Sequence, residues 1–277
     1  MSRLDEAIRT LRQDSRYVDI VRDSYLERDV HASAERFFHS AEFSEVRGLL
    51  GDRIQGSRIL DLGAGVGIAS YAFIKSGAHH VYAIEPDLSN EVGCGALKRL
   101  AADNPAIKII SGLGEHIPLA SESVDIVYVR QVLHHTHNLS LVLNECARVL
   151  CTGGVFLACR EHVVDNERQL QVFLSKHLIH QLAGGENAYR LNEYLDAIAA
   201  SGLRLERVFG PWDSILNAFP AVRDNNELAG FARTLLRRKL GLAGWLIGFV
   251  PGVESLVWQY LKRPVPGRMY SFLANKP

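Results

Sequence analysis

The chain has 277 residues with 31 basic and 31 acidic side chains, so its formal net charge is zero. This balance argues against a general nucleic-acid binder, which usually carries a basic domain or face. The length suits one large α/β domain with additions or two small domains, and no apolar run is long enough to span a membrane. The charged N-terminus predicts no secretory signal, and four cysteines without a CxxC pattern predict reduced thiols in a cytoplasmic protein.

Residues 1–50 have the pattern of helices, because apolar side chains recur at helical spacing between Tyr17 and Leu50. Beside a sheet, such helices form either a structural cap or a lid over a ligand. As a lid, they would bring Ser40 or Glu42 to the ligand. We favour the structural cap.

A short, mostly apolar run from Ile59 to Leu62 leads into three glycines at alternate positions, and a helical pattern over 68–76 follows. This predicts a buried parallel strand, a tight turn and a helix whose N-terminus faces a ligand. A second strand over 80–85 ends in Glu85, 20 residues after Gly65. An acid at that distance is placed to accept hydrogen bonds from a ribose diol. The pair predicts a ligand that contains adenosine.

The rest of the central region continues the alternation of helices and strands. We expect helices over 90–102 and 140–150 and strands over 107–111, 124–130 and 155–159. This order predicts a doubly wound parallel sheet, in which ligands bind outside the carboxyl ends of the strands. The rule gathers five polar residues along one edge of the sheet: Asp61, Glu85, Glu115, Arg130 and Arg160.

In their order, these motifs resemble the class I S-adenosylmethionine-dependent methyltransferases. The matching segments are 60–67 (LDLGAGVG), 84–87 (IEPD), 114–119 (GEHIPL), 124–127 (VDIV), 132–135 (VLHH) and 145–154 (ECARVLCTGG). The resemblance covers residues 57–160. It implies a Rossmann-like, seven-stranded, mostly parallel sheet with an antiparallel last strand, and the stretches 203–209 and 268–274 suit the last two strands.

The resemblance also implies how S-adenosylmethionine would be held. The three glycines would face its amino-acid end, Glu85 would bind the ribose hydroxyls, and Leu88 would pack near the adenine. Many relatives carry an acid for the adenine amine where this chain has Leu113, so we assign that contact to Gly114 and Glu115. The predicted cofactor-binding residues are Asp61, Gly63, Ala64, Gly65, Gly67, Glu85, Pro86, Leu88, Gly114, Glu115, Arg130 and Gln131.

Methyl transfer to a hydroxyl is an in-line displacement that needs a general base, and histidine suits this near neutral pH. The candidates follow the fourth and fifth strands, and each also has a purely structural interpretation. We favour His162, because a charged triplet directly after an apolar strand is costly unless it is paired or used. The predicted catalytic residues are His134, His135, Glu161 and His162.

A second, narrower resemblance lies in the segments 160–164, 177–180 and 184–189. It is to a subgroup that we associate with bacterial polysaccharide and secondary-metabolite gene clusters. The predicted acceptor-binding residues are Arg160, His177, His180, Glu186, Asn187 and Tyr189.

Three features of this region stay open at the level of sequence. Arg130 and Arg160 either clamp an anionic group of the acceptor or pair with nearby acids. His177 and His180 share a face if residues 172–182 form a helix. A metal site built from His162, His177, His180 and Glu186 lacks the HExxH pattern, so we predict no metal ligands.

A long insertion over 211–267 precedes the last strand. A basic stretch from Arg233 to Lys239 is followed by an apolar stretch from Leu240 to Val250. This composition over 222–263 is typical of an interfacial membrane segment, although an acceptor lid or a homodimer contact is the favoured alternative. The predicted organisation is a helical cap (1–50), a core (51–210), the insertion (211–267) and the last core strand (268–277).

The sequence therefore predicts a cytoplasmic methyltransferase, at most peripheral to the inner membrane. Its acceptor would be a hydroxyl of a sugar, glycan or other small molecule. An NAD-dependent oxidoreductase is the alternative, but its fingerprint spaces the glycines as GxGxxG, and here the spacing is GxGxG. A non-catalytic protein that binds S-adenosylmethionine is the third hypothesis.

Overall fold

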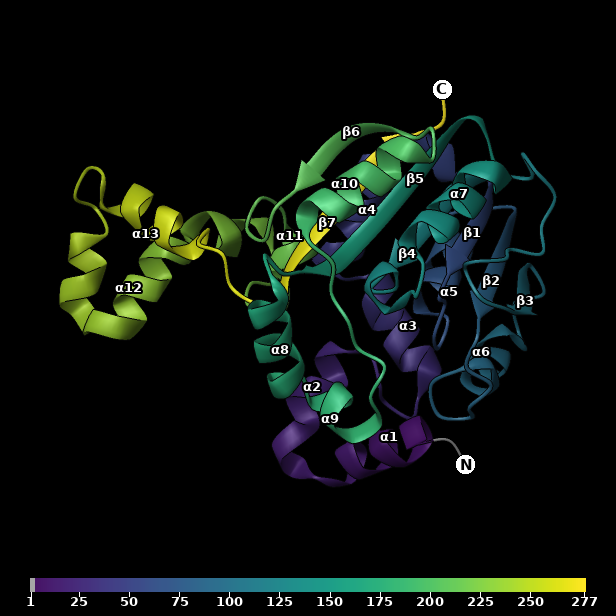
Figure 1. The fold of residues 1–277 in the computed structure, drawn as a ribbon. Coiled ribbons are helices and arrows are strands. Elements are labelled where there is room, and N and C mark those ends of the chain that lie inside the picture. The colour runs from purple at the N-terminus through teal and green to yellow at the C-terminus, as the bar shows by residue number, and fades with distance from the viewer. Residues whose placement is uncertain (1–2) are drawn as a thin grey trace.

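The computed structural model describes residues 3–277 and has a seven-stranded sheet at its centre (Figure 1). In chain order the strands are β1 (Arg58–Leu62), β2 (His80–Glu85), β3 (Ile107–Ser111), β4 (Val124–Arg130), β5 (Leu150–Val163), β6 (Arg204–Phe209) and β7 (Arg268–Asn275). Their order across the sheet is β3-β2-β1-β4-β5-β7-β6. The first five strands pair in parallel, and β7 lies antiparallel to both β5 and β6. The predicted Rossmann-like fold with an antiparallel last strand is confirmed.

Helices cover both faces of the sheet, which is why the central strands are apolar on both sides. On one face, Ile59 of β1 and Tyr128 of β4 join a core with α3 (Val30–Phe38), α4 (Ala41–Leu50) and α5 (Ile68–Lys75). On the other face, Leu60 of β1 and Val127 of β4 pack with α7 (Leu139–Val149) and α10 (Leu191–Ala200). The helix α6 (Cys94–Ala101) packs beside β3.

The N-terminal helices are fastened to the sheet by a chain of aromatic rings. Besides α3 and α4, this region holds α1 (Arg3–Gln13), α2 (Val18–Asp23) and the 3₁₀ turns η1 (Ser15–Tyr17) and η2 (Gly51–Ile54). Successive ring centroids lie 5.4, 5.3, 5.4 and 5.1 Å apart along the series Tyr25, Phe37, Phe43, Phe73 and Tyr128. These contacts link α3 and α4 to α5 and β4, so the N-terminal region shares the main core.

The strand β5 is longer than the sequence predicts. It continues to Val163, and Glu161 and His162 pair with Tyr270 and Met269 of β7. A bulge near Arg160, whose φ is +63°, shifts the register between the two paired stretches. The charged triplet from Arg160 to His162 therefore lies inside the sheet, and not after the end of the strand.

The predicted helix over 172–182 is two helices. The helix α8 (Glu167–Lys176) ends before His177, whose ψ of 112° is extended, and α9 (Leu178–Ala183) begins after it. His177 and His180 therefore do not share the face of one continuous helix. The break turns His177 toward the loop that leads into α10.

The insertion before β7 is helical: its first helix packs against β5 and β7, and the two that follow stand away from the sheet (Figure 1). It contains α11 (Ile215–Ala218), α12 (Asn225–Ile247), which is kinked at Gly241, and α13 (Val253–Leu261). Trp212 holds α12 and α13 together at their base: its ring stacks on Phe231 at 4.8 Å, and its Nε1 donates to the Leu261 carbonyl at 3.1 Å. Among the described residues, no helix is both long and apolar enough to cross a membrane.

Candidate active site

The glycine turn after β1 requires backbone conformations that side chains resist. Gly63 and Gly67 have φ of +68° and +89°, and a Cβ on Gly63 would collide with Val132. The turn is tied to the tip of β2, because the Gly65 amide donates to Glu85 Oε2 at 2.7 Å. Glu85 Oε1 accepts from the Asp87 amide at 2.9 Å, so the carboxylate position is fixed from two sides.

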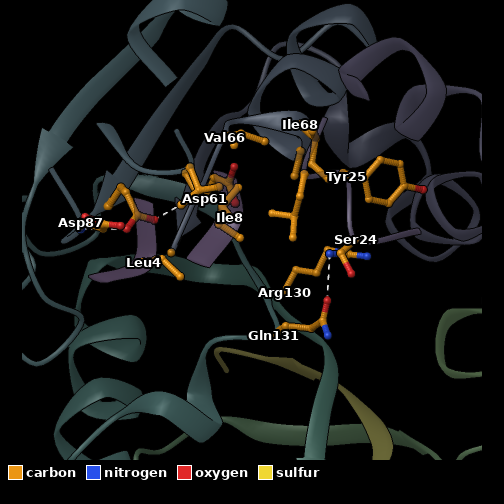
Figure 2. Close-up of a pocket in the computed structure, with 17 residues that line it drawn as sticks. Leu4, Ile8, Ser24, Tyr25, Asp61, Val66, Ile68, Asp87, Arg130 and Gln131 are labelled. Carbon is orange, nitrogen blue, oxygen red and sulfur yellow. Dashed lines mark hydrogen bonds between the residues drawn. The ribbon is translucent and has the colours of Figure 1, made fainter. Parts of the chain in front are cut away.

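A cavity of about 300 Å³ lies over this turn (Figure 2). We call it the cofactor cavity, because predicted cofactor-binding residues line it. In Figure 2, Asp87 and Leu4 lie toward one end of the cavity, and Ser24 and Tyr25 lie toward the other. The cofactor-binding residues from the sequence that line it are Asp61, Gly63, Ala64, Gly65, Glu85, Arg130 and Gln131. Those outside its walls are Gly67, Pro86, Leu88, Gly114 and Glu115, and Leu88 is 70% exposed.

Two buried carboxyl groups face the cavity. Burial raises the pKa of Asp61 to about 6, although its Oδ2 accepts a hydrogen bond from Ser70 Oγ at 2.6 Å. Burial also raises the pKa of Glu85, against the two amides that donate to it. Within residues 3–277 neither carboxylate forms a salt bridge, although the charge of Arg130 acts on Asp61, so a ligand with ammonium or hydroxyl donors would complement them.

The N-terminal region closes one side of the cavity, as in the lid alternative, but through residues other than Ser40 and Glu42. Leu4 and Ile8 of α1 and the residues Ser24–Leu26 line it. Their helical spacing predicts only an apolar face. No motif marks them as ligand contacts, because the walls form only when α1 docks on the sheet.

The structure shows an ion pair for Arg130, one of the two alternatives that the sequence leaves open for the two arginines. Arg130 forms a double contact with Glu42, with Nε–Oε1 and Nη2–Oε2 distances of 2.6 and 3.0 Å. Arg160 is buried, and its Nη1 donates to the Leu216 and Phe219 carbonyls at 2.9 Å each. Arg130 lines the cofactor cavity, whereas Arg160 is fastened to α11, so the two groups do not converge on one ligand. Nor does Glu42 reach a ligand.

A second cavity of about 420 Å³ adjoins the first. Ser24, Leu26 and Gln131 line both cavities. Five predicted catalytic or acceptor-binding residues come together in the second one, which we call the histidine cavity: His134, His135, His162, His177 and Glu186. The structure therefore places candidate reacting groups directly beside the cofactor cavity.

Hydrogen bonds fix the tautomers of three of these histidines. His134 Nδ1 lies 2.7 Å from Glu161 Oε2, His135 Nδ1 lies 3.0 Å from the Gly185 carbonyl, and His162 Nδ1 lies 2.7 Å from the Gly267 carbonyl. These partners only accept, so each Nδ1 carries a proton and donates it. In the uncharged rings, Nε2 is the atom that can take a proton or bind a cation.

Two neighbouring histidines of the histidine cavity have pKa values shifted in opposite directions. Burial and the charge of His134 lower the pKa of His162 to about 3. Burial opposes protonation of His134 as well, but Glu161 and Glu186 outweigh it and raise its pKa to about 9.

The other predicted site residues stay behind or beside the cavities. Glu161 is fully buried behind His134, where it also accepts from the Val132 and His134 amides at 3.1 Å each. Tyr189 donates its hydroxyl proton to the Thr136 carbonyl and packs edge-on against Tyr194. Glu115 accepts from the His137 amide at 3.2 Å, and His180 and Asn187 are outside the walls of the histidine cavity.

The comparisons with known proteins fit this geometry. The family model described as "Methyltransferase domain" matches residues 60–158, from the glycine turn to β5. Over residues 60–158 the chain matches this methyltransferase family, as its resemblance to the class I S-adenosylmethionine-dependent methyltransferases predicts. Demethylmenaquinone methyltransferase of Thermobifida fusca is 30% identical over 144 residues, which are 51% of this chain and 58% of that protein. Ubiquinone biosynthesis O-methyltransferase of Agrobacterium fabrum is 26% identical over 167 residues, 59% of this chain and 66% of that protein.

Among solved structures, geranyl diphosphate C-methyltransferase of Streptomyces coelicolor A3(2) has the same fold. Its complex with Mg²⁺, geranyl diphosphate and S-adenosyl-L-homocysteine aligns with a TM-score of 0.57 at 14% identity, over 85% of this chain and 81% of that one. The matched segments span less than two thirds of both curated relatives. The methyltransferase match over residues 60–158 indicates S-adenosylmethionine as the methyl donor.

The residues at the first cavity fit this cofactor. Glu85 keeps free lone pairs for ribose hydroxyls, and Asp61 is a buried anion near the glycine turn, where a ligand ammonium can approach. The backbone of Gly63 and Gly65 has no Cβ to block the amino-acid end. The precise contacts of Leu88, Gly114 and Glu115 with adenine stay a prediction.

Replacing Asp61 with Asn should stabilise the cofactor-free protein at pH 7 by about 3 kcal/mol, which corresponds to a pKa shift from 3.8 to about 6. The folded-state pKa lies above the ordinary value, so the folded protein keeps this proton longer than the unfolded one. The cost of the carboxylate therefore appears as pH rises from 3.8 to about 6, and is complete above that range. Urea unfolding at pH 7 and pH 4 would measure it; equal gains at both pH values would contradict the assignment.

Proposed function

We propose that this protein transfers a methyl group from S-adenosylmethionine to a hydroxyl oxygen of a small acceptor bound in the histidine cavity. The observation that supports it most is the shared wall of Ser24, Leu26 and Gln131 between the two cavities. The cofactor supplies a methyl group on a sulfonium, and the protein must align an oxygen with it and accept the hydroxyl proton. In this proposal His162 is the general base: its lowered pKa keeps the ring neutral at pH 7, its Nδ1 proton is fixed on Gly267, and its Nε2 is free to take a proton that the Glu186 carboxylate would help to stabilise.

The acceptor is proposed to be a hydroxylated ring or a sugar. The relatives named for ubiquinone and menaquinone support a ring, and the narrower resemblance in the sequence supports a sugar or glycan. Imidazole rings in the cavity suit either, because they stack on flat rings and on the apolar faces of sugars. An oxygen acceptor agrees with the similarity to ubiquinone biosynthesis O-methyltransferase and to the malonyl-[acyl-carrier protein] O-methyltransferase of Methylococcus capsulatus.

Transfer of isotopically labelled methyl groups tests this function. We expect label from S-adenosylmethionine to appear as an O-methyl group on members of a catechol panel or of a sugar panel. The same acceptors with their hydroxyls already methylated are the control and should take up no label. Label found only on nitrogen or carbon, or turnover that requires NAD, would contradict the proposal.

We further propose that α12 and α13 dock on the surface of an anionic membrane, which would place the protein in the cytoplasm at the inner membrane. Arg237, Arg238 and Lys239 are exposed on α12. The large apolar side chains that are exposed beside them are Leu240, Leu242, Trp245, Leu246, Ile247, Phe249 and Val250. Neither helix lines the cofactor cavity or the histidine cavity, which argues against an acceptor lid. Basic and apolar groups side by side favour an anionic lipid surface over a homodimer.

Vesicle flotation would measure this docking. The protein should float with vesicles that contain phosphatidylglycerol and much less with pure phosphatidylcholine. Leu242 and Leu246 are 72% and 56% exposed. Replacing both with Ser should lower the partition of the protein into the vesicles at least about tenfold, because less apolar surface is buried in the membrane. Leu141→Ser on α7 is the matched control. Equal partition of both variants, or a concentration-dependent dimer that the double variant abolishes, would overturn membrane docking.

A further inference from the structure

Three candidate metal-ligand atoms, Nε2 of His134, Nε2 of His135 and a carboxylate oxygen of Glu186, face one another in the histidine cavity. No hydrogen bond joins them. His134 and His135 belong to the 3₁₀ turn η3 (Leu133–His135) after β4, and Glu186 comes from the loop between α9 and α10. Glu186 Oε2 lies 3.6 Å from His134 Nε2 and 3.8 Å from His135 Nε2. The candidate ligand atoms of the three residues all lie within 4.8 Å of one another.

When each ring carries one proton, on Nδ1, all three atoms keep a lone pair, and a bound metal ion would displace the second proton that His134 holds near pH 7. Both imidazoles donate a hydrogen bond from Nδ1: His134 donates to the Glu161 carboxylate, and His135 donates to the Gly185 carbonyl. Glu186 Oε2 has no hydrogen-bond partner among the described residues, and its side chain is only 7% exposed. The two distances are too long for hydrogen bonds. A buried carboxylate with no donor is unfavourable unless a cation lies against it.

We propose that His134 Nε2, His135 Nε2 and the Glu186 carboxylate bind a divalent transition-metal ion of the zinc class. Ligands at about 2.0–2.1 Å from a tetrahedral ion lie about 3.3–3.4 Å apart, so the two separations from Glu186 need to close by only a few tenths of an ångström. The third pair of ligand atoms lies within 4.8 Å. Imidazole ligands favour zinc and similar ions over magnesium or calcium. Two histidines and one glutamate leave a fourth position open, as in catalytic zinc sites.

The surroundings of the three ligands support a built site. Metal-bound histidines usually donate their second N–H to a carboxylate or a carbonyl, and His134 and His135 show one of each. Glu161 is itself held by the Val132 and His134 amides, so the ring of His134 is oriented from behind. A fourth imidazole, His177, borders the same carboxylate, with its Nδ1 3.6 Å from Glu186 Oε1.

The role of the ion rests on the proposed methyl transfer to oxygen. A hydroxyl that enters the open position would bind through its oxygen and lose its proton more readily, because a divalent cation stabilises the oxyanion. His162 lies next to the ligand set, with its ring centroid 4.7 Å from that of His134, and would receive the proton. The ion would thereby fix the acceptor oxygen at the boundary with the cofactor cavity.

Metal binding can be measured without any activity. The purified chain, stripped of metal, is dialysed against Zn²⁺ at pH 7.5, and bound metal is counted by mass spectrometry. We expect one ion per chain, and about 100-fold or weaker binding in Glu186→Gln and in His135→Gln. His31→Gln, on the exposed side of α3, is the control and should bind as the unaltered protein does. Binding of S-adenosylhomocysteine by every variant would show that each is folded.

Two results would overturn the site: no bound zinc at all, or unchanged affinity in both ligand variants. In either case the cluster is an ion-paired, protonated His134 between its two acids. Methyl transfer is measured on the same samples. If methyl transfer proceeds without metal at an unchanged rate, the metal ion does not activate the acceptor hydroxyl, and the proposed function is unaffected. If the site binds zinc but no hydroxyl is methylated, the function falls and the metal site stands.

Discussion

Replacing His162 with Gln should lower kcat by about 10²–10⁴-fold, the usual loss when a general base is removed. Glutamine can keep a hydrogen bond to the Gly267 carbonyl through its amide but cannot take a proton. Because His162 lines only the histidine cavity, the affinity for S-adenosylhomocysteine should stay as it is. Single-turnover methyl transfer and calorimetry would measure the two quantities separately.

The control for this variant is His31→Gln, which changes an exposed histidine far from both cavities. A loss of cofactor affinity equal to the loss of kcat would mean that His162 supports the fold and not the reaction. A kcat within about threefold of the unaltered protein would assign the proton to another acceptor, since the loss of a base costs far more.

Replacing Glu42 with Gln should destabilise the protein by about 3–5 kcal/mol, because it leaves the buried charge of Arg130 without its partner. The Glu42 side chain is fully buried, and the side chain of its partner Arg130 is only 13% exposed. Burial alone would raise the pKa of Glu42, but Arg130 and Arg160 hold it below its ordinary value. Urea unfolding at pH 7 would measure the loss, and the transition should stay cooperative.

Two further variants make this prediction specific. Glu35→Gln removes a carboxylate from an exposed pair with Lys75 and should cost at most about 1 kcal/mol. The double variant Glu42→Leu with Arg130→Met should recover much of the stability, because neither charge is then buried. If Glu42→Gln cost no more than Glu35→Gln, the pair would not fasten α4 to the sheet.

The sequence predicted the parts of the molecule that local residues decide. The glycines after β1 and Glu85 after β2 meet because parallel neighbours end at the same edge, and the structure joins them by the Gly65–Glu85 hydrogen bond. The strands β2, β3 and β4 have the predicted bounds, and most residues of β2 and β4 are buried.

What the sequence could not predict depends on partners far along the chain. The end of β5 is set by pairing with Met269 and Tyr270, which no residue near His162 reveals. Tertiary packing alone brings α1 to the wall of the cofactor cavity. It also brings the Glu186 carboxylate next to His134. The sequence places Arg160 beside Arg130 at the crevice edge, but its Nη1 donates to the Leu216 and Phe219 carbonyls, which lie far along the chain.

The structure of the complex with S-adenosylhomocysteine tests the central claim most directly. We predict that the ribose hydroxyls bind Glu85 and that the sulfur lies at the boundary marked by Gln131, facing the histidine cavity. A sulfur that faces away from His134 and His162, or a ligand bound outside the cavity over the glycine turn, would contradict it.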